Sequence, residues 1–80
     1  MRLHYVYILE SQTGEHRYTG LTNDIARRLK EHNAGSVGHT SKYKPWKFRT
    51  IIGFNCRKRA AEFEKYLKTG SGRAFSIKRL

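Results

Sequence analysis

Residues 3–9, Leu-His-Tyr-Val-Tyr-Ile-Leu, form a run rich in aliphatic and aromatic side chains, with His4 near its start. Successive side chains of a strand point to opposite faces, so Tyr7 and Leu9 would lie on one face and Val6 and Ile8 on the other. Apolar side chains on both faces are typical of a central strand that is covered on both sides. The chain is therefore expected to place structure on each face of a sheet.

Turn and capping residues divide the rest of the chain into further elements. Thr22 or Asn23 is placed to cap one helix and Asn55 a second, and Gly70-Ser71-Gly72 is expected to end the second helix. Residues 35–44 are polar and contain two glycines, which predicts a loop. The expected order is strand 3–9, strand 17–20, helix 24–33, strand 47–54, helix 57–68 and a short helix 73–80.

Length and composition indicate a single small domain. The chain has 80 residues, of which 38% are hydrophobic and 12% aromatic, enough for one core and too many for a disordered tail. We predict one α/β (α+β) domain over residues 1–80, with a small three-stranded mixed or antiparallel sheet, two main helices and a short C-terminal helix. Its one cysteine, Cys56, excludes an internal disulfide. No apolar run approaches the roughly 20 residues that span a bilayer, so we expect a cytoplasmic protein without membrane contacts.

The charge is strongly unbalanced. Seventeen lysines and arginines against six acidic residues give a formal net charge of +11. Lysines and arginines that neutralise phosphates release condensed counterions, which favours a nucleic-acid partner. A membrane surface is a weaker alternative because no basic helix with a continuous apolar face is evident.

Arg28 lies on an unexpected side of the first helix. Each helical step turns about 100°, which places Arg28 about 60° from Ile25 and beside His32, at the border of the inward stripe. An arginine there must extend to solvent or meet a partner. The ordinary explanation is an ion pair with Asp24, one turn earlier.

Glu64 is the acidic counterpart on the second long helix. It lies about 40° from Ala60, inside the apolar stripe that continues to Leu67. A carboxylate on a core-facing stripe is costly unless it is paired or binds a cation. An internal salt bridge, for example to Arg28, is one explanation, and a Mg²⁺ ligand facing a cleft is the other.

Tyrosines and histidines supply further candidates. On their own, tyrosines are more often core or base-stacking residues than catalysts. The histidines show no metal-ligand spacing, and only His32 lies where chemistry is suspected. The tyrosines are Tyr5, Tyr7, Tyr18, Tyr43 and Tyr66.

Four short motifs occur in one order along the chain: Tyr5-Val6-Tyr7, then Tyr18-Thr19-Gly20, then Gly-x₇-Arg-x₃-His from residue 20 to residue 32, then Ala-x₃-Glu from residue 60 to residue 64. Together they resemble the GIY-YIG nuclease family over nearly the whole chain. The chain is most similar to the small stand-alone members and to the N-terminal nuclease module of the bacterial excision-repair incision subunit. It departs from the family at Tyr5-Val6 in place of Gly-Ile, at Thr19 in place of Ile, and at residues 70–73, where many relatives carry an asparagine.

The resemblance implies a role for each matched residue. Tyr7 and Tyr18 would line the cleft, and one of them would orient or deprotonate the attacking water. Arg28 would stabilise charge on the scissile phosphate and His32 would assist proton transfer. Glu64 would hold a single Mg²⁺ or Mn²⁺ ion, which neutralises charge that develops during phosphodiester hydrolysis.

The expected function is a divalent-metal-dependent endonuclease that acts on nucleic acid, with DNA as the expected substrate. A separate DNA-binding domain is common in the family, and here the chain's own basic surface would bind instead, with little sequence specificity. The alternatives are a catalytically idle nucleic-acid-binding module with the same fold and an accessory subunit of a larger complex. The residues expected to bind nucleic acid are Lys42, Tyr43, Lys44, Trp46, Lys47, Arg49, Arg57, Lys58 and Arg59.

Overall fold

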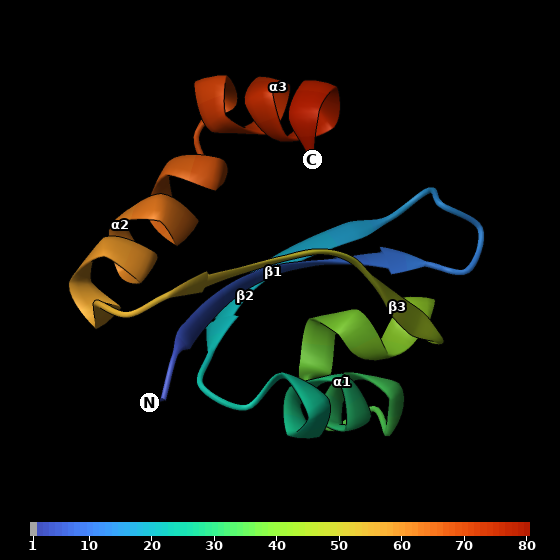
Figure 1. Cartoon of the computed structure of the whole chain (residues 1–80). Coiled ribbons are helices and arrows are strands. Elements are labelled where there is room, and N and C mark those ends of the chain that lie inside the picture. The colour runs from blue at the N-terminus through green and yellow to red at the C-terminus, as the bar shows by residue number, and fades with distance from the viewer. Residues whose placement is uncertain (1) are drawn as a thin grey trace.

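The computed structural model describes residues 2–80 and contains the strands and helices in the predicted order, with one addition (Figure 1). None of the helices in this range is long and apolar enough to cross a membrane. The elements are β1 (His4–Ser11), β2 (Arg17–Thr22), α1 (Ile25–Asn33), the short 3₁₀ helix η1 (Gly38–Tyr43), β3 (Trp46–Phe54), α2 (Arg57–Leu67) and α3 (Gly70–Arg79).

The first strand is central, as predicted. The sheet has the order β2-β1-β3, and β1 pairs antiparallel with both neighbours. In Figure 1 the sheet separates α1 and η1 on one side from α2 and α3 on the other. The predicted α+β class and three-stranded sheet are confirmed, and every pairing is antiparallel rather than mixed.

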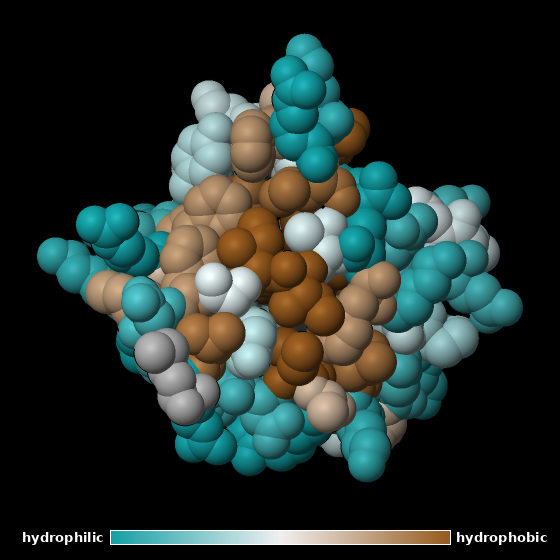
Figure 2. Space-filling model, viewed as in Figure 1, coloured by the Kyte–Doolittle hydropathy of each residue, from teal (hydrophilic) through white to brown (hydrophobic). Residues whose placement is uncertain are grey.

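Each face of β1 supports a separate core. Val6 and Ile8 pack with Ala60 and Leu67 of α2. On the opposite face, Tyr7 and Leu9 pack with Trp46, and half-buried Tyr18, Leu29 and Phe48 surround them. Apolar atoms also gather at the middle of the face seen in Figure 2, and hydrophilic atoms surround them.

Residues 38–43 form η1, so the prediction of an unstructured loop over residues 35–44 was wrong at its centre. The segment is ordered by polar contacts that its composition does not reveal. The indole N–H of Trp46 donates to the carbonyl of Thr40 at 2.8 Å. The side chain of Asn33 bonds both backbone groups of Trp46, which connects the end of α1 to the start of β3.

Both predicted helix caps are corrected. Asp24 caps α1, because its carboxylate accepts the Arg27 amide at 3.1 Å, while the hydroxyl of Thr22 accepts the amide of Asp24. Cys56, and not Asn55, lies at the start of α2 and makes no side-chain capping bond.

The tripeptide Gly70-Ser71-Gly72 begins α3 instead of only interrupting the chain, which is a further correction. The Thr69 hydroxyl accepts the Gly72 amide at 3.1 Å and so caps the new helix. A Cβ atom at Gly72 would lie 1.8 Å from the carbonyl oxygen of Tyr66. The glycine is therefore required for the first turn of α3 to pack against the end of α2.

Candidate active site

Tyr7 lies at the centre of the candidate site, on the face of the sheet that α1 covers. It is buried in β1 and pairs in register with Gly20 of β2. A Cβ atom at position 20 would lie 2.4 Å from the Tyr7 hydroxyl oxygen. Gly20 therefore leaves the room across which the Tyr7 ring extends toward α1, which explains the glycine of the second motif.

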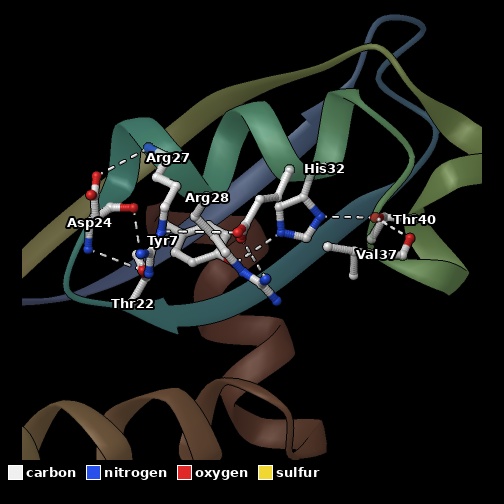
Figure 3. Close-up of polar contacts among 9 residues, drawn as sticks. Tyr7, Thr22, Asp24, Arg27, Arg28, His32, Val37 and Thr40 are labelled. Atoms are coloured by element: carbon white, nitrogen blue, oxygen red, sulfur yellow. Dashed lines mark hydrogen bonds and ion pairs between the residues drawn. The ribbon is translucent and has the colours of Figure 1, made fainter.

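His32, on α1, forms a hydrogen bond with the Tyr7 hydroxyl (Figure 3). Tyr7 Oη lies 3.0 Å from His32 Nε2, and His32 Nδ1 lies 2.8 Å from the hydroxyl of Thr40 in η1. Thr40 donates its own proton to the carbonyl of Val37, so its oxygen is left to accept the Nδ1–H of His32. These partners assign the tautomer: Nε2 is the acceptor, and Tyr7 donates to it.

Arg28 approaches Tyr7 from one turn before His32. Its Nε donates to the Tyr7 hydroxyl at 3.3 Å, and its Nη1 donates to Glu31 at 3.0 Å. The expected pair with Asp24 is absent, because Asp24 caps the helix instead. About one third of the Arg28 side chain (32%) stays exposed, so the guanidinium connects the buried tyrosine to solvent.

Burial and the arginine charge set the protonation of this site. Burial raises the pKa of the Tyr7 hydroxyl, and the hydrogen bond from Arg28 opposes that shift. Burial also lowers the pKa of His32, and the neighbouring Arg28 charge lowers it further. The hydrogen bond to Glu31 is the main cause that raises the pKa of Arg28. The resting site therefore holds a neutral tyrosine, a neutral histidine and a charged arginine.

Tyr18 connects this buried group to a surface cavity. Its ring centroid lies 6.3 Å from that of Tyr7 and 4.8 Å from that of His32. On its other side lies the ring of His39 from η1, with a centroid distance of 5.2 Å. Tyr7, Tyr18, Arg28 and His32 are thus gathered in one place, as the motifs suggested.

Glu64 lies on α2 and is engaged within its own helix. Its carboxylate pairs with Lys68, one turn on, and 19% of the side chain is exposed. Of the two explanations for Glu64, the internal salt bridge is present, but its partner is Lys68 and not Arg28, which pairs with Glu31. Lys68 therefore occupies the position of a counter-cation beside the proposed metal ligand.

Glu64 could hold a divalent ion only if waters and phosphate oxygens supply the other ligands. Among residues 2–80 no group of three or more histidine, cysteine, aspartate or glutamate side chains could hold a metal ion. Mg²⁺ commonly keeps several waters and binds one or two carboxylates plus substrate phosphates. Glu64 with waters and phosphate oxygens meets that donor set, provided that Lys68 moves aside.

A cavity of about 450 Å³ lies between these two parts of the site. Tyr18 contributes to it from β2, and Lys68, the partner of Glu64, contributes from α2. The cavity therefore adjoins both the tyrosine group and the carboxylate helix. Its lining consists of Ile8, Arg17, Tyr18, Thr19, His39, Leu67, Lys68, Arg73, Ser76 and Ile77.

The basic residues expected to bind nucleic acid do not form one patch. Lys42, Tyr43, Lys44, Lys47 and Arg49 lie in η1, the following turn and the start of β3. The second group, residues 57–59, opens α2 beyond the far end of β3, a nine-residue strand about 27 Å long.

Two aromatic members of that surface differ from each other. Trp46 is buried and hydrogen-bonded to Thr40, so its indole is covered, contrary to the expectation of an exposed stacking residue. Tyr43 is exposed and stacks on the ring of His16 at 3.7 Å. Arg49 forms an ion pair with Glu10.

Several residues of the site were absent from the sequence prediction. Thr40 orients His32, Glu31 holds Arg28, and Lys68 pairs with Glu64. The i,i+3 and i,i+4 spacings of the two ion pairs are visible in the sequence and could have been used. Nothing local marks Thr40, because its partner comes from a different element.

Fold and site together define a small α+β domain that gathers tyrosine, arginine and histidine beside a basic cavity. Residues 3–78 match the model of the GIY-YIG catalytic domain. The chain therefore belongs to the GIY-YIG family.

Relatives within this family are of similar size. A UPF0213 protein of Cupriavidus necator is 40% identical over 75 residues, which cover 89% of this chain and 80% of that protein. A UPF0213 protein of Halobacterium salinarum is 36% identical over 67 residues, 82% of this chain and 86% of that protein. The solution NMR structure of the UPF0213 protein BH0048 of Bacillus halodurans superimposes with a TM-score of 0.57 at 30% identity, covering 95% of this chain and 83% of that one.

A longer relative carries a functional name. The structure-specific endonuclease subunit SLX1 homolog of Giardia intestinalis is 37% identical over 65 residues, which cover 75% of this chain and 18% of that protein. The shared portion therefore corresponds to one domain of the longer protein.

Proposed function

We propose that the chain is a divalent-metal-dependent endonuclease that hydrolyses phosphodiester bonds in nucleic acid, with DNA as the substrate and little sequence specificity. The observation that carries this proposal is the Tyr7 hydroxyl, held at 3.3 Å from Arg28 Nε and 3.0 Å from His32 Nε2. A hydroxyl that donates to a neutral imidazole and accepts from an arginine is arranged for proton transfer beside an anion.

The proposed proton path runs from water through Tyr7 to His32. The hydroxyl oxygen of Tyr7 takes a proton from the attacking water while its own proton passes to Nε2 of His32. His32 can accept that proton because its imidazole is neutral at rest, a state that burial favours by lowering its pKa. Thr40 holds the imidazole in the required tautomer. Of the two candidate tyrosines, Tyr7 is thus the one proposed to transfer the proton. Tyr18 is proposed to line the site and contact the substrate.

Arg28 is the proposed ligand of the scissile phosphate. Its Nε is used by Tyr7 and its Nη1 by Glu31, which leaves further N–H donors on the exposed part of the fork. A guanidinium binds phosphate oxygens in a fixed, often bidentate geometry. The arginine would therefore place the phosphate next to the hydroxyl that activates water.

Glu64 is the proposed ligand for Mg²⁺ or Mn²⁺. The bound ion would neutralise charge on the phosphate and the leaving oxygen. The protein supplies one carboxylate on α2, next to a cavity that also contains Tyr18.

The family supports an activity of this kind. The Giardia relative is named a structure-specific endonuclease subunit, and the match covers the domain that both proteins share. The formal charge of +11 supports a polyanionic substrate. Basic residues at both ends of β3 suit backbone contacts, which carry little sequence information.

One observation favours a second candidate, a catalytically idle module that binds nucleic acid, either alone or as an accessory subunit. Lys68 already neutralises Glu64, so the carboxylate is satisfied without a metal. Such a module would bind nucleic acid in a salt-sensitive manner and would not cleave it.

The experiment that separates the candidates compares two neighbouring arginines. Arg28→Ala removes the proposed phosphate ligand, and Arg27→Ala removes the same charge from a side chain that is 66% exposed and does not contact Tyr7. With plasmid and structured DNA in Mg²⁺ or Mn²⁺, the endonuclease proposal predicts cleavage that Arg27→Ala retains and Arg28→Ala reduces by about 100-fold or more. Salt-sensitive binding without cleavage by the wild-type protein would favour the binding module instead.

A further inference from the structure

The cavity beside Tyr18 is lined by basic residues that are not among those predicted to bind nucleic acid. Two arginines line it, Arg17 from β2 and Arg73 from α3, and neither belongs to the basic surface predicted from sequence. Lys68 and His39 add nitrogen groups from α2 and η1. Its volume of about 450 Å³ lies within the range of small-molecule and nucleotide sites.

The positive charge of this cavity is poorly balanced. Lys68 pairs with Glu64, but no carboxylate of the described residues lies within ion-pair distance of Arg17 or Arg73. Glu10, the acid whose charge acts on Arg17, pairs with Arg49. Two arginines thus remain available to an anion.

Arg17 is also held toward the cavity by a polar side chain. Its Nη1 donates to Ser76 Oγ at 3.4 Å, and Ser76 is buried in α3. Burial and the charge of Arg49 both lower the pKa of Arg17, so its cationic form gains from an added negative charge. Arg17 lies on β2 and Arg73 on α3, so the cavity has an arginine on each of these two elements.

We propose that this cavity binds a backbone phosphate of the nucleic acid, next to the reacting one, through Arg17 and Arg73. The site rests on the proposed function, because its ligand is a neighbouring phosphate of the same strand. Tyr18 lines the cavity and its ring centroid lies 6.3 Å from that of Tyr7, so the cavity adjoins the proposed reacting site. The bound phosphate would lie between β2 and α3, at a position separate from the basic residues at the two ends of β3.

A pair of matched variants on one helix tests this site. Arg73→Ala removes a cavity arginine, while Arg79→Ala removes an equal charge from the exposed end of α3, outside the cavity. Binding of a fluorescent oligonucleotide is measured by anisotropy at several salt concentrations, with EDTA present so that no cleavage occurs. Circular dichroism confirms that both variants fold.

The proposal predicts a clear difference between the two variants. Arg73→Ala weakens binding by about tenfold and lowers the slope of log K against log salt by roughly one, because one phosphate contact is lost. Arg79→Ala changes affinity by less than about threefold. Arg17→Ala is expected to weaken binding as much as Arg73→Ala, although it also removes the hydrogen bond to Ser76.

Each other outcome has a distinct meaning. Equal effects of Arg73→Ala and Arg79→Ala, with tight binding by the wild-type protein, would overturn the cavity site and leave the proposed nuclease untouched. Failure of the wild-type protein to bind any oligonucleotide at low salt would overturn both. If the wild-type protein does not cleave DNA in Mg²⁺ or Mn²⁺ but Arg73→Ala still weakens binding, the catalytic proposal is overturned and the phosphate site is kept.

Discussion

The two faces of the sheet are built on alternate residues of one strand, yet they differ in kind. On the α2 side, Val6 and Ile8 meet alanine and leucine, and the contact is apolar throughout. On the α1 side, Tyr7 brings a hydroxyl into the core, and a fully buried histidine and threonine meet it. Burying polar groups costs stability unless they are bonded.

That cost is offset on the α1 face by complete pairing. No buried side-chain nitrogen or oxygen of residues 2–80 lacks a hydrogen-bond partner. An apolar core would hold α1 against the sheet as well, so the polar chain from Arg28 to Val37 is not needed for folding alone. The comparison teaches that both faces bury a core, while only the α1 face also buries the polar groups that the proposed function uses.

The largest expected effect is on activity, from Tyr7→Phe. The change removes one hydroxyl from the α1 face and keeps the ring that packs there. Cleavage should fall by about 100-fold or more, the usual loss of a general acid or base. The measurement is the rate of nicking under saturating metal, and near-normal activity would exclude Tyr7 as the proton-transferring group.

The matching change on the other face is Ile8→Ala. Ile8 is fully buried against the α2 side, so we expect a loss of about 2–5 kcal/mol in the free energy of unfolding. Activity per folded molecule should fall far less than in Tyr7→Phe, because Ile8 lines the cavity but carries none of the proposed reacting groups. Urea denaturation followed by circular dichroism measures the first quantity, and nicking at low temperature measures the second.

A smaller effect is expected from Thr40→Val, which has a similar shape and no hydroxyl. The Nδ1–H of His32 would lose its acceptor, costing about 1–3 kcal/mol of stability. The imidazole should then lose its fixed tautomer, which ¹⁵N chemical shifts of the ring report directly. Thr40→Ser should restore both the shifts and the activity, and an unchanged tautomer in Thr40→Val would contradict the role of this hydroxyl.

The smallest effect concerns pH and stability. Because the pKa of His32 is lowered in the folded protein, the unfolded chain takes up a proton near the ordinary histidine pKa while the folded chain does not. His32 therefore makes stability fall as pH drops below about 6.5 toward the lowered value, with a slope of at most about 1.4 kcal/mol per pH unit.

A pair of variants isolates that slope. His32→Gln should be less stable at neutral pH but show a flatter pH dependence between pH 7 and pH 5. The matched control is His4→Gln, which removes an imidazole on the α2 side of β1, away from His32. An equally steep slope in His32→Gln would show that another group is responsible.

Periodicity predicted most of the fold because its cause is local. The two-faced character of residues 3–9 identified the central strand, and helical spacing placed Arg28 at the border of one apolar stripe and Glu64 inside the other. The predicted N-caps were wrong by one or two residues, because threonine, asparagine and aspartate are all favoured at this position and the local sequence does not decide between them. The start of α3 was missed because the packing of Gly72 on Tyr66 is a tertiary contact.

Only those site residues that belong to one of the sequence motifs could be predicted. Tyr7, Tyr18, Arg28 and His32 are brought together, whereas the pairing of Glu64 with Lys68 and the burial of Trp46 depend on how elements meet. The same holds for the cavity, since Arg17 and Arg73 are 56 positions apart in sequence. Charge counts predicted a polyanionic partner but did not predict where that partner would bind.

The central claim is that one carboxylate on the α2 side supplies the metal for chemistry on the α1 side. Glu64→Gln tests it most directly, with Glu62→Gln as a control, since Glu62 lies on the same helix, is exposed and lacks the ion pair with Lys68. Initial nicking rates are measured against Mg²⁺ and Mn²⁺ concentration for both variants. We predict metal-dependent cleavage that Glu62→Gln retains and Glu64→Gln loses by about 100-fold or more. Equal activity and equal metal dependence in the two variants would contradict the account.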